Sequence, residues 1–339
     1  MNLRCWPLLL LVVALSAPAV RAASINGHAY QPLADWAGAN GFRAVSWHTS
    51  PVTLTNRTTR LVLEKDSCTA QINGVNVMLS FPVAVDKGKY LIAPLDLTKT
   101  IEPLVFAPKV SAKKITTIVL DPGHGGKDPG NRSGWHYEKT YTLALATEVR
   151  DQLKAAGFNV LLTRTKDKFV ELAERPDLAN RQHADLFVSL HFNATESGKG
   201  EVCGPETYCI TPLGAASSNA QGEGASHSAT MANGCERKSL LLAYQVQKAL
   251  VRNLGAEDRS VRRARFAVLR DAEMPAILVE SGYMTHPVEG KKILDAGYRK
   301  QIAAAIVKGI VNYQKLTAPS AAVTGGTGKP SKTKDRASR

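Results

Sequence analysis

The chain has 339 residues, enough for about two domains, and 44% of them are apolar, as in ordinary soluble globular proteins. Lys and Arg outnumber Asp and Glu by 43 to 29, and the formal charge of +14 favours an acidic partner: nucleic acid, a membrane surface or an acidic cell-wall polymer. Because aromatic residues make up only 6% of the chain and no basic run is interleaved with them, the composition argues against nucleic acid.

Residues 1–22 are typical of a secretory signal peptide. Arg4 gives a basic start, residues 7–17 form an apolar core, and residues 20–22 (VRA) end in a small-residue cleavage site. We therefore expect an exported protein, either periplasmic or associated with the cell wall. The apolar run is short for a bilayer-spanning helix, so no stable membrane span is expected after cleavage. An uncleaved N-terminal anchor is the alternative.

Four cysteines remain once Cys5 leaves with the signal peptide, namely Cys68, Cys203, Cys209 and Cys235. An even number of cysteines in an exported protein permits disulfides, with three possible pairings. Since three of the four lie close together in sequence, we expect one bridge and free thiols. No C-x-x-C pair is present, so a four-cysteine zinc site is not expected.

Residues 24–106 predict a small, mainly β domain. Short runs of alternating apolar and polar residues indicate strands, for example residues 60–64 and 75–79. Asn73-Gly74, between two such runs, is typical of a two-residue hairpin turn. We therefore expect a compact β unit ahead of the larger part of the chain.

The rest of the chain divides into a linker, a large domain and a tail. Residues 107–114 (APKVSAKK) are polar, contain a proline and predict the linker. Residues 317–339 are rich in Pro, Ser, Gly, Thr and Lys and predict a disordered basic tail. Residues 115–316 alternate strands and helices and predict an α/β domain. Its expected strands are 118–120, 158–163, 185–190, 206–211, 266–269 and 276–280, and its expected helices are 140–156, 175–182, 240–254 and 294–316.

Acidic and imidazole side chains stand at four boundaries of these elements. Residues 118–130 read IVLDPGHGGKDPG, which places His124 among glycines just past a buried strand. Glu138 precedes the first helix of the domain, while His191 and Glu280 end two further predicted strands. An ionised carboxylate at a buried strand end is unfavourable unless it is paired or metal-bound. We therefore expect the four side chains to meet at one edge of the sheet.

Two imidazoles and one carboxylate form the ligand set of a catalytic zinc site that keeps one coordination position open. Zinc lowers the pKa of water to about 7, so the remaining carboxylate can act as general base at neutral pH. The same metal polarises a carbonyl group. The chemistry that this set of residues indicates is hydrolysis of an amide.

A resemblance to a known family rests on four stretches, VLDPGHGGKDPG, the Glu138-Lys139 pair, ADLFVSLHFNA and PAILVESGYMTHP. Together they resemble the zinc-dependent N-acetylmuramoyl-L-alanine amidases of the amidase-3 type over nearly all of residues 115–316. The resemblance implies a twisted, mostly parallel sheet with helices on both faces. It also implies hydrolysis of the amide between N-acetylmuramic acid and L-alanine in peptidoglycan.

The same resemblance implies the roles of the site residues. His124, Glu138 and His191 match the family's ligands for one zinc ion, and Glu280 matches its catalytic carboxylate. The N-terminal part loosely resembles the N-terminal-like domain of copper amine oxidases, which implies a structural or binding module without copper. We expect this module and the basic tail to hold the protein on its polymer and to take no part in the chemistry.

Two other functions fit the same pattern, a zinc peptidase on this scaffold and a non-catalytic protein that binds the cell wall. Peptidoglycan is the expected partner, an activator protein is possible but unidentified, and no nucleic-acid partner is expected.

His136 could line the cleft, whereas His183 and His227 are expected to be solvated, with substrate contact open for His227. A basic run forms either a solvated face or a site for carboxylates of the stem peptide, and its members are Arg259, Arg262, Arg263, Arg265 and Arg270.

Overall fold

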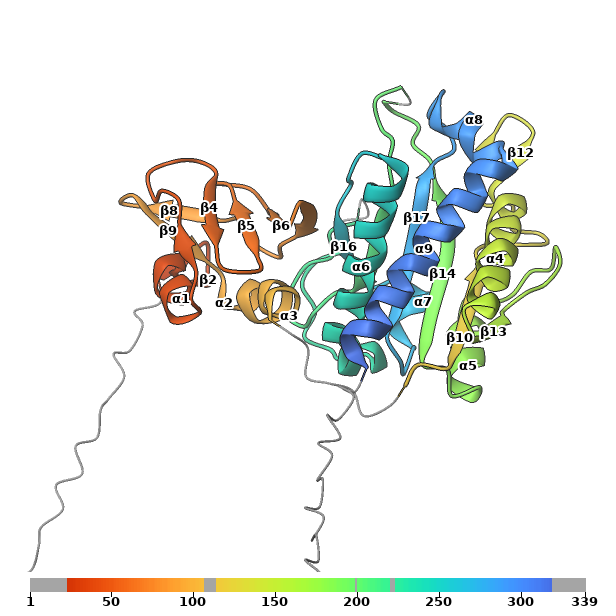
Figure 1. Cartoon of the computed structure of the whole chain (residues 1–339), viewed down its shortest axis with the longest axis horizontal. Helices are drawn as coiled ribbons and strands as arrows, with labels where there is room; N and C mark the ends of the chain where they lie inside the picture. Colours follow the sequence, from red (N-terminus) through yellow and green to blue (C-terminus); the bar gives the residue numbers. More distant parts are fainter. Residues whose placement is uncertain (1–22, 107–113, 199, 220–222, 319–339) are drawn as a thin grey trace, which may run out of the picture.

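The structure is a computed structural model that describes residues 23–106, 114–198, 200–219 and 223–318. The predicted signal peptide, all but the last residue of the predicted linker, and the tail from residue 319 lie outside the described residues. Figure 1 shows a smaller N-terminal unit beside a larger unit in which helices pack on a sheet. None of the described helices is both long and apolar enough to cross a lipid bilayer.

The N-terminal unit is mainly β, as predicted. Four strands form an antiparallel sheet, β1 (Ala23–Ile25), β2 (His28–Pro32), β9 (Lys89–Ile92) and β8 (Ala84–Asp86). A meander follows the order β3 (Arg43–Ala44), β4 (Val52–Thr55), β5 (Arg60–Leu63), β6 (Thr69–Ile72) and β7 (Val75–Met78). Asn73 and Gly74 both have positive φ, 49° and 80°, and join β6 to β7 in the predicted two-residue turn.

Short helices flank these strands. Helix α1 (Leu33–Ala39) buries Leu33, Trp36 and Ala37. After β9, one continuous helical stretch consists of α2 (Pro94–Asp96), the π-helical turn η1 (Leu97–Ile101) and α3 (Glu102–Val105). Sequence analysis did not predict this last helical stretch, in which two prolines at first-turn positions interrupt the apolar pattern.

The large unit contains a mostly parallel sheet, which confirms the predicted fold class. Its strand order is β13 (Asn159–Leu162), β10 (Thr117–Pro122), β14 (Leu186–Asn193), β17 (Ala276–Tyr283), β15 (Glu206–Ile210) and β16 (Val261–Ala264). Only β15 against β17 is antiparallel within this set. Beside the start of α4 lies a small hairpin, β11 (Arg132–Ser133) and β12 (His136–Tyr137).

Helices cover both faces of this sheet. One face carries α4 (Glu138–Ala155), α6 (Glu236–Leu254) and α9 (Ala296–Thr317), whereas the other carries α5 (Glu174–Arg181) and α7 (Ala267–Arg270). Successive side chains of β10 point to opposite faces of the sheet, which explains why helices cover both. Ile118 and Leu120 belong to one apolar cluster, and Val119 belongs to the other. Two short helices complete the unit, η2 (Met231–Cys235) and α8 (Glu289–Leu294).

The predicted strand at residues 266–269 is wrong. Residues 267–270 form α7, and the strand of this region is β16, which begins five residues before the predicted one. The apolar pair Val268 and Leu269 packs as one helical turn, and so short a run does not distinguish a strand from a helix. β16 was missed because it contains Arg262 and Arg263. Arg263 is buried, and its guanidinium donates to the carbonyl oxygens of Ile210 and Lys99.

The predicted disulfide is also wrong, because all four described cysteines are free. Cys209 is buried on β15, where the guanidinium of Arg263 contacts its Sγ. Cys203 contacts Glu257, and Cys235 lies at the end of η2. Proximity in sequence misled the prediction, because the fold places these cysteines on separate elements.

The N-terminal unit is joined to the large unit by strand pairing and side-chain contacts. β7 pairs with β16 at Val77 and Val261, which extends the main sheet to 11 strands. The Tyr244 hydroxyl on α6 donates to the carbonyl oxygen of Ile72 over 2.9 Å. Apolar residues of both units form one buried cluster. The two units therefore share a core.

A buried ion pair anchors the carboxyl end of β10. The guanidinium of Arg175 on α5 donates to Asp121 over 2.8 Å, and the two side chains are only 2% and 0% exposed. Asp121 also accepts hydrogen bonds from the hydroxyls of Thr163 and Ser189. A further N–H of Arg175 donates to the backbone oxygen of His124. This ion pair therefore holds the loop that follows β10.

Replacing Arg175 with Met is expected to lower the free energy of unfolding by about 3–5 kcal/mol, because the carboxylate of Asp121 is left buried without its cation. The measurement is urea unfolding followed by circular dichroism. Arg181→Met is the matched control on the same helix, since the ion pair of Arg181 with Asp177 is solvent-exposed, and it should change stability by no more than about 0.5 kcal/mol. Equal losses in both variants would contradict the assigned importance of the buried pair.

Candidate metal site and catalytic cleft

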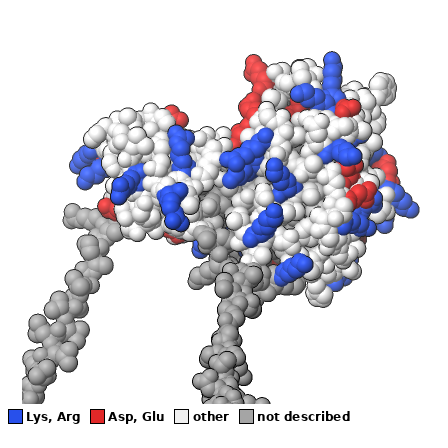
Figure 2. All heavy atoms as spheres, in the orientation of Figure 1, with Lys and Arg blue, Asp and Glu red and all other residues white. Residues whose placement is uncertain are grey.

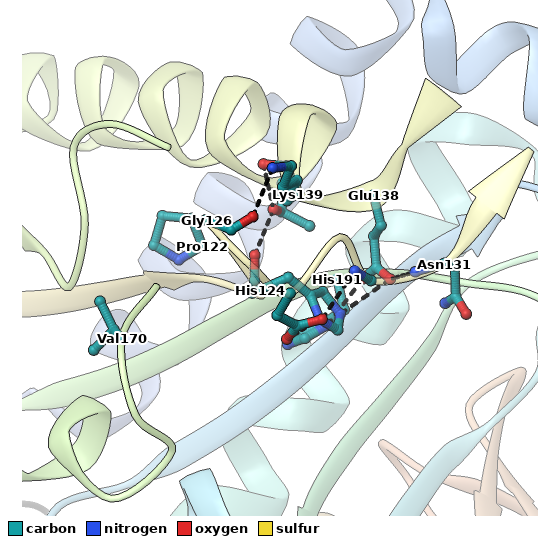
Figure 3. Close-up of polar contacts among 12 residues, drawn as sticks. Pro122, His124, Gly126, Asn131, Glu138, Lys139, Val170 and His191 are labelled. Carbon is teal, nitrogen blue, oxygen red and sulfur yellow. Dashed lines mark hydrogen bonds and ion pairs between the residues drawn. The ribbon is translucent and has the colours of Figure 1, made fainter. Parts of the chain in front are cut away.

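Three of the four predicted site residues meet at the carboxyl edge of the parallel sheet. His124 follows β10, Glu138 begins α4, and His191 lies on β14. Glu138 lies between the two imidazoles, with His124 Nε2 at 3.0 Å from its Oε2 and His191 Nδ1 at 2.9 Å from its Oε1 (Figure 3). One nitrogen or oxygen atom from each residue lies within 4.8 Å of the others, which is a spacing suited to a metal ion.

Glu138 is fully buried and is fixed by the backbone as well as by the imidazoles. Its Oε1 accepts from the N–H of Phe192 over 3.1 Å, and its Oε2 accepts from the N–H of Asn131 over 2.9 Å. Burial alone would raise its pKa, but hydrogen bonds from His124 and His191 outweigh burial and hold the pKa well below its ordinary value. Glu138 is therefore an ionised carboxylate suited to a cation.

Glycines give the cluster its space. A Cβ on Gly123 would lie 2.2 Å from the ring of His191, and a Cβ on Gly130 would lie 2.6 Å from the ring of His124. His124 itself has φ = +61°, an unusual conformation for a residue with a side chain. The glycine-rich loop thus allows the two imidazoles to approach each other, and their ring centroids are 4.9 Å apart.

Asp128 orients His124 and was not singled out from the sequence. Its Oδ2 lies 2.8 Å from Nδ1 of His124, which favours a proton on Nδ1 and leaves Nε2 facing Glu138. Burial would lower the pKa of His124, but Glu138 and Asp128 outweigh burial and raise it. The sequence GHGGKD could have suggested this contact, because an aspartate four residues after the histidine can reach the imidazole when glycines let the chain turn back.

The donor atoms fit a zinc ion. Two ligand atoms of a tetrahedral zinc site lie roughly 3.3 Å apart, and one ligand atom from each of the three residues lies within 4.8 Å of the others, so a zinc ion would draw the donors closer together. Two imidazoles and a carboxylate are also the donor types that zinc prefers in hydrolytic sites. A carboxylate on the outer nitrogen of His124 is a common support for a zinc ligand.

Glu280 lies next to this cluster, although not at a strand end as predicted. It occupies the middle of β17, directly opposite His191 on β14 and opposite Glu206 on β15. His191 is likewise inside β14, which continues to Asn193 through an irregularity in register. Both predicted strand ends were too early because the following residues, FN and SGY, continue the extended backbone. Paired residues on neighbouring strands share one face of the sheet, so Glu280 lies on the same face as His191.

The environment of Glu280 is unfavourable to its charge. Burial and the nearby carboxylates of Glu138 and Glu206 raise its pKa well above the ordinary value. Its Oε2 is buried and has no hydrogen-bond partner among the described residues. A buried oxygen without a hydrogen-bond partner is unfavourable for folding, and such atoms are typical of functional sites. Glu280 therefore has the surroundings of a proton-transfer group.

A cavity of about 440 Å³ opens beside Glu280, on the side of β15 and β16. Glu206 forms part of its wall, is 2% exposed and accepts hydrogen bonds from Asn193 over 2.6 Å and from Arg262 over 2.8 Å. Sequence analysis missed Asn193 and Glu206, because a polar residue at a strand boundary is ordinary without the register. The same cavity is lined by Arg259 and Tyr283.

The other histidines considered from the sequence lie apart from the described cluster. His136 is exposed and contacts the hydroxyl of Tyr141 at 2.6 Å. His183 is exposed at the end of α5, as expected. His227 lies exposed near Gly214, and the question of substrate contact stays open for it.

The sheet and the His-Glu-His cluster at its carboxyl edge define an α/β protein with a site of the metallohydrolase type. A family model described as N-acetylmuramoyl-L-alanine amidase matches residues 118–312. The chain belongs to this family, as the sequence predicted.

Individual relatives agree with this assignment. The N-acetylmuramoyl-L-alanine amidase LytC of Bacillus subtilis is 36% identical over 199 residues, which are 59% of this chain and 36% of LytC. The amidase AmiA of Escherichia coli is 31% identical over 61% of this chain and 78% of its own length. The crystal structure of an N-acetylmuramoyl-L-alanine amidase from Clostridium difficile 630 is 32% identical, with a TM-score of 0.51 over 60% of this chain and 98% of that one.

Proposed function

We propose that this chain hydrolyses the amide between N-acetylmuramic acid and L-alanine in peptidoglycan. The observation that carries the proposal is the buried Oε2 atom of Glu280, which has no hydrogen-bond partner among the described residues and lies beside the His-Glu-His cluster. Family membership supports the choice of substrate, since the relatives are N-acetylmuramoyl-L-alanine amidases. The chain spans only 36% of LytC, so the activity is inferred for this chain and not transferred whole from that relative.

His124, Glu138 and His191 would hold one zinc ion, and Glu280 would be the general base. When bound, zinc supplies positive charge that polarises the scissile carbonyl and lowers the pKa of a water molecule and of nearby acids. Glu280 takes the proton of the attacking water and delivers it to the nitrogen of the leaving alanine. Asp128 holds His124 in orientation throughout.

The remaining organisation follows from composition and charge. Residues 24–106 would form an accessory unit and residues 115–316 the catalytic unit, because all four site residues lie in the second. Basic side chains are spread over both units in Figure 2, as suits an acidic polymer. We propose peptidoglycan as the polymer and an exported location, since a cell-wall polymer lies outside the cytoplasm. A protein activator stays a prediction.

Digestion of purified sacculi separates this function from its alternatives. An amidase releases stem peptides that begin with a new free N-terminal alanine, which end-group labelling followed by mass spectrometry detects. New N-termini at other residues would instead identify a peptidase. Binding to sacculi without any new N-terminus, in protein loaded with zinc, would identify a non-catalytic wall-binding protein.

A further inference from the structure

The cavity beside Glu280 has an arginine, Arg259, whose ion pairs within the protein are long, at 3.9 and 4.0 Å. Arg259 precedes β16 and contributes to the cavity wall together with Arg262. The two arginines differ in their partners. Arg262 donates to Glu206 over 2.8 Å and to the carbonyl oxygen of Ser218 over 2.9 Å, so its guanidinium is engaged within the protein.

Arg259 has weaker partners. Its Nε is 4.0 Å from Glu206, and its Nη1 is 3.9 Å from Glu257, both beyond hydrogen-bond distance. The Nε atom is buried and has no hydrogen-bond partner among the described residues. The guanidinium also makes a side-chain hydrogen bond with Tyr283 and lies 5.2 Å from the centroid of its ring, which supports it from one side. The side chain is 23% exposed and lines the cavity, so its outer N–H groups can bind an acceptor from outside.

The backbone around Arg259 is held in place. Asp258 accepts hydrogen bonds from the Gln247 side chain and the Ser260 N–H, each over 2.9 Å, and from the N–H of Asn76 over 2.7 Å. Asn76 lies on β7, so the N-terminal unit itself fixes the residue that precedes Arg259. A fixed guanidinium loses little conformational freedom when it binds a planar anion.

We propose that Arg259 binds a carboxylate of the peptide next to the amide that is cleaved. A guanidinium and a carboxylate match in shape and charge, and the cavity that Arg259 lines also contains Glu280. The inference rests on the proposed function, because that function supplies a peptide with free carboxylates. It assigns one of the predicted basic residues to peptide recognition, while Arg262 and Arg263 serve structural contacts.

Two soluble substrates test this inference, an N-acetylmuramoyl dipeptide with both of its carboxyl groups free and the same compound with both groups amidated. The zinc-loaded full chain should cleave the free form with a kcat/KM about 10–100-fold higher. Arg259→Gln should lose most of this preference, through a large rise in KM on the free form and a much smaller change on the amidated form. Arg259→Lys keeps the positive charge but cannot bind a carboxylate through two N–H groups, so its preference for the free form should be intermediate.

Arg270→Gln is the control, since Arg270 is an exposed member of the same basic run and does not line this cavity. Its substrate preference should equal that of the unmodified protein. Equal cleavage of the two substrates by the unmodified protein, or an equal loss on both in Arg259→Gln, overturns the inference alone. Failure of the zinc-loaded protein to cleave either substrate overturns the proposed function and this inference with it.

Discussion

Replacing Glu280 with Gln should lower the rate of amide hydrolysis by a factor of about 10²–10⁴, the range lost when a positioned acid–base group is removed. The substitution keeps the size of the side chain and removes its ability to take a proton. It also relieves the repulsion that Glu138 and Glu206 exert on this buried carboxylate. We therefore expect Glu280→Gln to be at least as stable as the unmodified protein while it loses activity.

Three measurements distinguish this role from a structural one. Zinc content should stay at about one per chain, because Glu280 is not among the three clustered donors. The melting temperature should not fall, and kcat should fall far more than KM rises. Glu273→Gln is the control, since Glu273 is exposed three residues before β17, and it should keep full activity. Near-normal turnover in Glu280→Gln would remove Glu280 from the proton transfer.

The three residues proposed as ligands could be picked out from the sequence because each lies in a stretch with its own local signal. His124 stands among glycines, and Gly123 and Gly130 have no room for a side chain beside the imidazoles. His191 follows the buried strand run LFVSL. Strands that are parallel and adjacent bring such residues to one edge, so their meeting could be expected from the sequence although the strand order could not.

Strand register and side-chain pairing could not be predicted. Glu206 lies opposite Glu280 because β15 runs antiparallel to β17. The residues of β15 do not indicate the direction in which the strand runs. Asp128 forms a hydrogen bond with the ring of His124, and this contact depends on the conformation of the glycine-rich loop. β16 could not be recognised from the sequence because it contains two successive arginines. Arg262 faces the cavity and Arg263 contacts the N-terminal unit, so the strand has no alternating apolar pattern.

The contact between the two units bears on the expectation that the N-terminal unit takes no part in the chemistry. Asn76 on β7 donates to Asp258, which precedes the arginine proposed to bind the peptide. Lys99 pairs with Glu236, and its carbonyl oxygen accepts from Arg263 on β16. These contacts support a second role for the unit, in which it braces one wall of the cleft as well as binding the polymer.

Replacing His191 with Ala should reduce the zinc content from about one per chain to a small fraction. The variant keeps only two of the three clustered donors, and three protein ligands are typical of hydrolytic zinc sites. Activity on sacculi should fall together with zinc content. Elemental analysis of protein purified with excess zinc and then dialysed measures the first quantity directly.

His136→Ala is the matched control, because His136 is exposed, lies outside the cluster and contacts the hydroxyl of Tyr141 through a ring nitrogen. It should retain zinc. Loss of His191 also removes a hydrogen bond from Oε1 of buried Glu138, so folding needs a separate check. In the presence of a chelator, the melting temperatures of His191→Ala and the unmodified protein report this structural loss alone. Added zinc should then raise the melting temperature of the unmodified protein, since a ligand of the native state stabilises it, and leave that of His191→Ala almost unchanged. An equal zinc content in both proteins would refute the proposed ligand set, because the cluster would then not depend on its second imidazole.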